Sequence, residues 1–255
     1  MRNKFIANET QSALTEARSV RRKLKKPPVY FLGGKGGEHR DYVGNFGAMI
    51  VNRAIDNFDD AMFLLEARRH PSACVIARGL IETIAFGYYT LHTVRKELEV
   101  SGSEAADMLV IKHTNSNFFK TKDQAALKKG VFDLDSHEFT DEAKTRMLSE
   151  SASTVRVSKA LTYMFKDEQI QTGEKESKIE LVYDGLCEWT HPSQMSLFTY
   201  YANGGEMTPT SAGAVHVKQS AKLQCAMGLK AIVFLPTLID GYAALSSEIN
   251  AARAA

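Results

Sequence analysis

The sequence predicts an all-α protein, a helical bundle with a basic N-terminal arm. In every long apolar segment, the apolar residues recur three or four positions apart, which is the spacing of a helix face. No segment alternates apolar and polar residues for long enough to make a sheet, and the only candidate strand, 214–217, is weak. The chain has 255 residues, of which 44% are hydrophobic and 24% charged, as is typical of folded globular proteins. We expect residues 1–41 to form a basic helix with a glycine-rich linker, and residues 42–255 a single bundle domain.

The first predicted helix, residues 9–26, carries most of the basic charge and ends at Pro27 and Pro28. Residues 1–26 contain eight Lys or Arg and two Glu, so their charge is 8 − 2 = +6, and the rest of the chain carries 24 − 28 = −4. Such an arm can bind phosphates or an acidic partner, and it can equally be a solvated helix end. The candidate nucleic-acid-binding residues are Arg18, Arg21, Arg22, Lys23, Lys25 and Lys26.

A glycine cluster, residues 33–37, follows the arm. It lacks the spacing and the hydroxyl residue of a phosphate-binding loop, so it predicts a connector. The next helix carries one apolar stripe from Tyr42 to about His70. The helix after that begins at the N-cap candidate Ser72 and runs to about Leu98. It is apolar nearly all round, which predicts a place at the centre of the bundle. Further helices are expected over 103–119, 140–165, 175–190 and 219–251, with polar links at 130–138 and 166–173.

The central predicted helix contains two opposite charges, Arg78 and Glu82. Residues four positions apart lie one turn apart on the same face of a helix. Because buried charge is costly unless it is paired, either these two ions form a structural pair or they line a polar cleft.

A second candidate region lies at residues 183–193, where Tyr183 and His191 lie near the apolar stripe of the helix. Pro192 disfavours helical backbone at the residue before it, so His191 should lie at the helix C-terminus. There the helix dipole favours the imidazolium ion, as would a nearby carboxylate such as Glu82 or Glu188. A capping histidine without a catalytic role is the alternative. The candidate catalytic residues are therefore Arg78, Glu82 and His191, supported by Tyr183 and Glu188.

Neither a metal nor a cofactor is expected. Glu188 and His191 form one Glu-x-x-His element, whereas a di-iron bundle needs two. The three cysteines, Cys74, Cys187 and Cys225, form no Cys-x-x-Cys motif and are interpreted as small buried residues. The sequence shows neither a signal peptide nor an uninterrupted apolar segment long enough to cross a bilayer. We therefore expect a cytoplasmic protein with reduced thiols and no membrane partner.

The arrangement of these residues resembles uncharacterised bacterial helical domains related to the HEPN superfamily. The resemblance rests on Arg78-x-x-x-Glu82 in a long helix and, about a hundred residues later, on Tyr183-x-x-Leu186-x-x-x-x-His191-Pro192. It would cover about residues 45–250. It implies a helical bundle, often dimeric, and for many members a metal-independent ribonuclease of a defence or toxin system. The usual HEPN signature, Arg then four to six residues then His, does not occur here, so Arg78 and His191 would come from different helices.

Two hypotheses follow for the function. In the first, the protein is a HEPN-like RNA nuclease or effector, in which His191 moves the proton, Arg78 stabilises the phosphorane charge and Glu82 orients one of them. In the second, it is a non-catalytic helical module that binds a partner protein or nucleic acid, and the same residues form a structural polar network. Side chains that open to solvent favour the first, and a dry, fully paired cluster favours the second. We also expect a homodimer, from the resemblance and from the apolar C-terminal helix.

Overall fold

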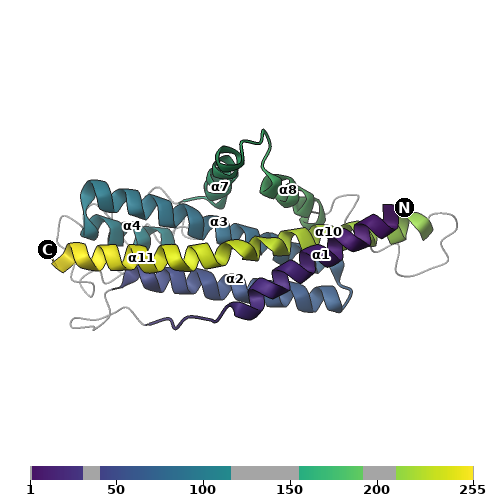
Figure 1. The fold of residues 1–255 in the computed structure, drawn as a ribbon, viewed down its shortest axis with the longest axis horizontal. Helices are drawn as coiled ribbons and strands as arrows, with labels where there is room; N and C mark the ends of the chain where they lie inside the picture. Colours follow the sequence, from purple (N-terminus) through teal and green to yellow (C-terminus); the bar gives the residue numbers. More distant parts are fainter. Residues whose placement is uncertain (1, 31–40, 116–154, 192–210, 255) are drawn as a thin grey trace, which may run out of the picture. The chain divides into compact units, whose positions relative to one another are not determined.

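The computed structural model describes residues 2–30, 41–115, 155–191 and 211–254, and throughout these ranges the regular elements are helices (Figure 1). The predicted all-α class is therefore confirmed. The elements are α1 (Arg2–Lys23), α2 (Tyr42–Glu66), α3 (His70–Ser101), α4 (Ser103–Asn115), α7 (Val157–Thr172), α8 (Lys178–Thr190), α10 (Ser211–Leu229), the 3-10 helix η2 (Lys230–Phe234) and α11 (Leu235–Ala254).

The chain groups into two compact units, and α2, α3, α7 and α11 each contribute residues to both of them. The first unit comprises Met1–Lys26, Asn52–Ile84 and Phe165–Pro236. The second comprises Pro27–Val51, Ala85–Met164 and Thr237–Ala255. The candidate site around Arg78 and Glu82 lies in the first unit.

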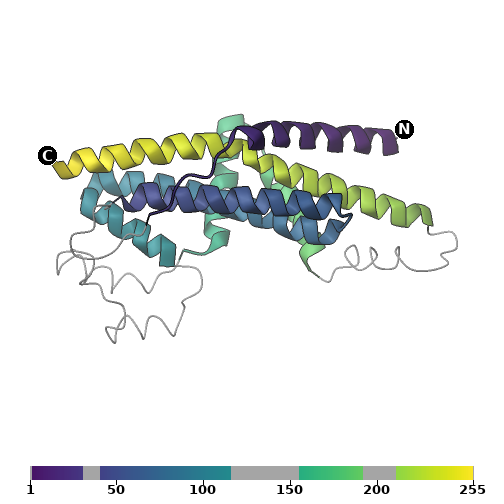
Figure 2. The ribbon, with the colours of Figure 1, turned by 90° about the horizontal axis from the view of Figure 1, so that it is seen from below.

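In the first unit, the helix predicted as an arm packs against α10 and η2 (Figure 1, Figure 2). Ala13, Leu14 and Ala17 of α1 are buried, with 5% or less of each residue exposed. An ion pair of 2.8 Å between Glu16 Oε2 and Lys230 Nζ links α1 to η2. The amphipathic character of α1 thus gives it an apolar face that packs on other helices of its unit.

The central helix α3 begins at His70, so Ser72, which was predicted to be its N-cap, lies within its first turn. Arg68 has a positive φ of 59°. Its backbone N–H donates to Leu65 O at 3.1 Å, and the N–H of Arg69 donates to Leu64 O at 2.8 Å. These two bonds form a Schellman motif, which satisfies the last carbonyls of α2. Proline is tolerated in a first helical turn, so α3 begins at His70 and includes Pro71.

Two expected non-helical segments are helical. Residues 166–173 were expected to form a polar link, but α7 continues through helix-forming residues to Thr172. It ends at Gly173, whose positive φ of 69° suits the residue after a helix. The candidate strand 214–217 lies within α10. A segment of four residues is too short for its residue pattern to distinguish strand from helix.

The predicted helix over 219–251 is interrupted by the five-residue 3-10 segment η2. Pro236 lies two residues beyond this segment and has no N–H to donate to the carbonyl four residues earlier, Ile232 O. The N–H of Leu235 donates to that oxygen instead, in the tighter three-residue pattern. The missing donor thus explains why the helix tightens at this point.

Within the described residues, one stretch, Val217–Ala254, is long and apolar enough to cross a membrane, with a mean hydropathy of 1.4 over its most apolar part. In this structure 39% of that part is buried. Length and composition alone are weak evidence for a membrane span, because the core helix of a soluble protein meets the same criteria.

The second unit contains an ion pair with little access to water. Asp107 of α4 is 5% exposed, and its Oδ2 atom pairs with Arg253 of α11. Its other oxygen, Oδ1, has no hydrogen-bond partner among the described residues. Burial raises the pKa of Asp107 to about 6, even though the bond with Arg253 acts in the opposite direction. The ion pair with Arg253 therefore offsets only part of the cost of removing the Asp107 carboxylate from water.

Candidate functional site

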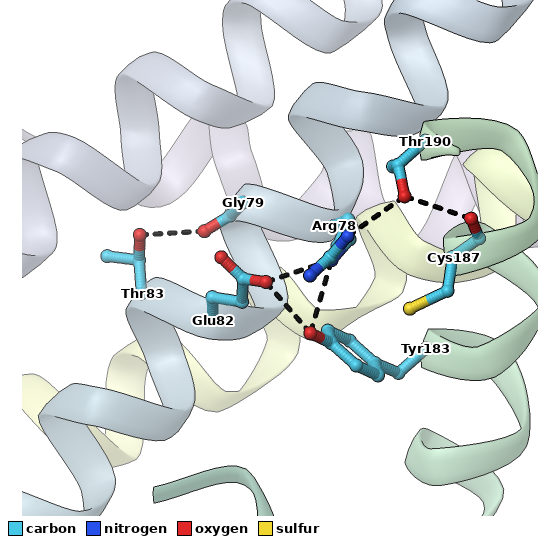
Figure 3. Close-up of polar contacts among 7 residues, drawn as sticks. All are labelled: Arg78, Gly79, Glu82, Thr83, Tyr183, Cys187 and Thr190. Atoms are coloured by element: carbon cyan, nitrogen blue, oxygen red, sulfur yellow. Dashed lines mark hydrogen bonds and ion pairs between the residues drawn. The ribbon is translucent and has the colours of Figure 1, made fainter. Parts of the chain in front are cut away.

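The charged pair predicted on the central helix is present in α3. Arg78 Nε donates to Glu82 Oε1 at 2.9 Å (Figure 3). The side chain of Arg78 is 26% exposed and that of Glu82 is 28% exposed. The pair therefore lies at the edge of the packed interior, in contact with both protein and water.

Helix α8 adds two hydroxyl groups to this pair. The Tyr183 hydroxyl donates to Glu82 Oε1 at 2.8 Å and accepts from Arg78 Nε at 3.1 Å. The Thr190 hydroxyl accepts from Arg78 Nη1 at 2.9 Å and donates to the backbone carbonyl of Cys187, also at 2.9 Å. The guanidinium also lies 5.2 Å from the centre of the Tyr183 ring, a cation–π distance. We refer to Arg78, Glu82, Tyr183 and Thr190 as the Arg78 cluster.

The start of α8 is fixed by a cap. Ser177 is the N-cap, and its hydroxyl accepts from the Glu180 N–H at 3.0 Å. Glu168 of α7 accepts from the Ser177 hydroxyl and, at 3.1 Å, from the Ile179 N–H. A carboxylate at this helix N-terminus satisfies a backbone donor and complements the helix dipole. These bonds define where α8 begins relative to the last turns of α7.

Two glycines allow α8 to pack closely on α10. Leu186 is fully buried, and a Cβ atom on Gly228 of α10 would lie only 2.7 Å from its Cδ1. A Cβ on Gly185 would similarly lie 2.6 Å from Gln224 Oε1. The two glycines allow this close approach because they have no side chain. Tyr183 and Thr190 are thereby held beside α3.

The electrostatics of the cluster keep its donors protonated. Burial alone would lower the pKa of Arg78, but the bond with Tyr183 and the charge of Glu82 raise it above its usual value. Burial, followed by the bond to Glu82, raises the pKa of Tyr183. Burial also raises the pKa of Cys187, although the charge of Arg78 opposes this effect. At neutral pH the cluster therefore presents a guanidinium ion and a protonated phenol.

Two polar atoms of the cluster have no internal partner. Within the part of the chain that the structure describes, Arg78 Nη2 and Glu82 Oε2 make no hydrogen bond. Both side chains are about a quarter exposed. One guanidinium donor and one carboxylate acceptor are therefore available to water or to a ligand.

His191 lies one residue beyond Thr190, at the C-cap of α8. Its backbone is extended, with φ −94° and ψ 155°, and its N–H donates to Cys187 O at 3.3 Å. The helix thus ends where the following proline predicted that it would. The side chains of His191 and Glu188 are exposed. The hydrogen bonds of the Arg78 cluster bring together Arg78, Glu82 and Tyr183 from the predicted set. None of these bonds includes the side chain of His191 or Glu188.

Sequence reasoning missed Thr190 as a member of the site. Its hydroxyl lies in the last turn of α8 and bonds the second guanidinium nitrogen. Its place on the apolar stripe directly before His191 was the only available signal. A hydroxyl on a buried stripe needs a partner.

The candidate nucleic-acid-binding residues of α1 and the segment after it fall into two sets. Arg18 pairs with Glu66 at 3.0 Å, and Arg21 makes two bonds to Asp59 at 2.8 and 2.7 Å. Lys26 pairs with Asp56, which is also in α2. The other set is exposed and makes no ion pair within the described residues: Arg22, Lys23 and Lys25. Nucleic-acid binding by these residues stays a prediction.

Comparison with known proteins finds no matching family model, no similar curated protein and no similar solved structure. Within the described residues, no group of three or more His, Cys, Asp or Glu side chains is placed to hold a metal ion. A guanidinium with one uncommitted nitrogen can donate to an anionic oxygen such as that of a phosphate.

Proposed function

We propose that this protein is a HEPN-like, metal-independent RNA nuclease or effector with the Arg78 cluster as its active centre. The observation that carries the proposal is that α3 and α8 bring together side chains about a hundred residues apart in sequence, in a polar cluster that water reaches. A purely structural network would be expected to be dry and fully paired. The Arg78–Glu82 pair is a quarter exposed, and two of its polar atoms have no partner within the described residues.

The proposed chemistry is attack of a ribose 2′-hydroxyl on the neighbouring phosphorus, with loss of the 5′-oxygen. Arg78 Nη2 would donate to a non-bridging oxygen of the phosphorane, where negative charge accumulates. Glu82 and Tyr183 would keep the guanidinium in place through the bonds that they already make. His191 would accept the proton of the attacking 2′-hydroxyl and donate a proton to the leaving 5′-oxygen.

Phosphate affinity needs more positive charge than the cluster provides, because Glu82 neutralises Arg78. Exposed cations of the same unit, Arg22, Lys23 and Lys25, are the proposed source. Each phosphate contact releases counterions, so RNA affinity should fall steeply with salt. Replacing these three residues by alanine should flatten that dependence more than replacing Arg18, Arg21 and Lys26, which are paired with carboxylates of α2.

The proposal is tested by cleavage of a labelled single-stranded RNA in the presence of EDTA. Wild-type protein should generate fragments that end in a 2′,3′-cyclic phosphate. We expect Arg78→Ala to lower the rate by at least about a hundredfold, in line with the loss of one charge-stabilising donor. Arg53→Ala, which removes an exposed arginine of α2, should leave the rate unchanged and is the matched control. Equal rates for the two variants, or no cleavage by wild type, would contradict the proposal.

A second candidate function is that of a non-catalytic binding module, and one observation favours it. Arg78 already uses Nε and Nη1 on three acceptors, and Glu82 cancels its charge, as a structural tie between α3 and α8 would require. Such a module would bind a partner protein or nucleic acid, and the expected homodimer would serve either function. RNA binding without cleavage, unaffected by Arg78→Ala, would favour the module over the nuclease.

A further inference from the structure

Two of the three cysteines are buried together where α3 meets α10 in the first unit. Cys74 and Cys225 are both fully buried. The Cys74 thiol donates to the backbone carbonyl of Ala221 at 3.3 Å. Ala221 lies one turn before Cys225 in α10, and helical side chains point back toward the N-terminus. The thiol of Cys225 is therefore directed toward the position that Cys74 occupies.

The Cys74 thiol lies against the turn of α10 that leads to Cys225. The neighbouring side chain of Cys225, together with burial, raises the pKa of the Cys74 thiol. A disulfide between the two would bring the sulfur atoms to about 2.05 Å. Both thiols are free in this structure.

The helices that carry the two thiols also approach each other closely. One turn after Cys74, Ala77 faces Gly228 of α10, and a Cβ on that glycine would lie 3.3 Å from the Ala77 Cβ. Small residues on both sides bring the two backbones near one another. A disulfide between neighbouring helices needs this short separation, because its Cα atoms usually lie about 4.4–6.8 Å apart.

We propose that Cys74 and Cys225 form an oxidisable dithiol, which hydrogen peroxide converts into an internal disulfide between α3 and α10. In the first step, one thiol loses its proton and the thiolate attacks a peroxide oxygen, which breaks the O–O bond and gives a sulfenic acid and hydroxide; the released proton converts the hydroxide into one water molecule. In the second step, the other sulfur displaces the sulfenic oxygen as a second water, with the S–H proton transferred to it. Two thiols and one hydrogen peroxide thus give one disulfide and two water molecules.

Burial governs the rate of this reaction more than its outcome. The reactive species is the thiolate, which is scarce in a buried site, so the first step requires a local opening of α3 or α10. Once one sulfur is oxidised, its partner is already adjacent, and the second step is intramolecular. The third cysteine, Cys187, lies on α8 near Arg78 and takes no part. The inference is independent of the proposed nuclease activity.

The test is peptide mapping of the whole protein after treatment with hydrogen peroxide. Free thiols are blocked with N-ethylmaleimide, and the protein is digested without reductant. A peptide pair joined through Cys74 and Cys225, lighter by two hydrogens than the separate peptides, is expected in wild type and in Cys187→Ser. It should be absent from Cys74→Ser and Cys225→Ser. Because burial slows the reaction, the treatment is repeated in urea below the unfolding midpoint, where the pair should form faster.

A thermal melt without reductant gives a second readout. Oxidised wild type and oxidised Cys187→Ser should melt at a higher temperature than their reduced forms, because the cross-link closes a long loop. The melting temperatures of Cys74→Ser and Cys225→Ser should not change on oxidation. The proposal would be overturned by a disulfide that includes Cys187, or by the absence of any linked peptide in folded protein at either urea concentration.

Discussion

The two units each contain an ion pair between an arginine and a carboxylate, and the two pairs are built differently. In the first unit, Arg78 and Glu82 are about a quarter exposed and share hydroxyl partners from α8. In the second unit, the Arg253 side chain is 25% exposed, whereas that of Asp107 is only 6% exposed. Asp107 Oδ1 has no hydrogen-bond partner among the described residues.

The difference shows why a pair of opposite charges does not by itself identify a functional site. The desolvation of a buried carboxylate can outweigh the attraction of its partner, and the raised pKa of Asp107 shows this imbalance. Around Arg78, the hydroxyl of Tyr183 bonds both charges and water reaches both side chains, so the pair can face a ligand. The second pair is therefore interpreted as a structural tie between α4 and α11, and the first as the candidate site.

The largest expected effect concerns the buried pair and its response to pH. The pKa of Asp107 rises from 3.8 to about 6 in the folded protein. A raised pKa means that the folded state binds the proton more tightly, so the stabilisation is complete below about pH 4 and is lost as the pH rises through 6. Two pKa units correspond to about 3 kcal/mol.

We therefore expect wild type to lose about 3 kcal/mol of unfolding free energy relative to Asp107→Asn between pH 4 and pH 7. Urea unfolding of both proteins across this range measures the difference. Parallel profiles would show that the pair with Arg253 fully compensates burial. The two ion pairs would then not differ in how well the charges are compensated.

The second largest effect is expected at the more exposed pair, Arg78 and Glu82. Arg78→Ala removes three side-chain hydrogen bonds and leaves Glu82 without its counter-ion. Since the pair is a quarter exposed, water can replace part of what is lost, and we expect a cost of about 2 kcal/mol in unfolding free energy. A cost above about 4 kcal/mol would indicate a fully buried charge and would remove the contrast with Asp107.

Tyr183→Phe tests the contribution of α8 alone. The variant keeps the ring beside Arg78 but loses the donor to Glu82 and the acceptor for Arg78. We expect a cost of about 1 kcal/mol, which a double-mutant cycle with Arg78→Ala should show to be coupled. Additive effects would mean that the bond between α3 and α8 contributes little.

The class of fold follows from the sequence because apolar residues at a spacing of three or four leave few alternatives to helices. The end of α8 was also predictable, since Pro192 limits the backbone of the residue before it. The packing of α1 on α10 was not predictable from the sequence. About 190 residues separate the two helices, and an apolar stripe on a helix does not indicate which other helix it will contact.

The candidate site was predictable in part. The same-helix relation of Arg78 and Glu82 follows from helix geometry. The contribution of Thr190, and the burial of Cys74 against the turn of α10 that leads to Cys225, depend on how α3, α8 and α10 pack. That packing relies on close approaches at Gly185 and Gly228, which no local pattern reveals.

The smallest expected effect comes from a third pair, on the surface of the first unit. Arg21 and Asp59 make a two-bond pair, with side chains 27% and 48% exposed. We expect Arg21→Ala to cost about 0.5–1 kcal/mol, because exposed pairs are well solvated when broken. A cost equal to that of Arg78→Ala would mean that the hydroxyl groups of α8 add nothing to a charge pair.

The central claim is that the Arg78 cluster acts on a ligand together with His191. It is tested most directly by measuring RNA cleavage and melting temperature side by side for His191→Ala, with His70→Ala as the histidine control. The His191 side chain is exposed, so we expect a melting temperature within a few degrees of wild type and a loss of cleavage of about a hundredfold or more. A folded His191→Ala protein that cleaves RNA at the wild-type rate would contradict the claim.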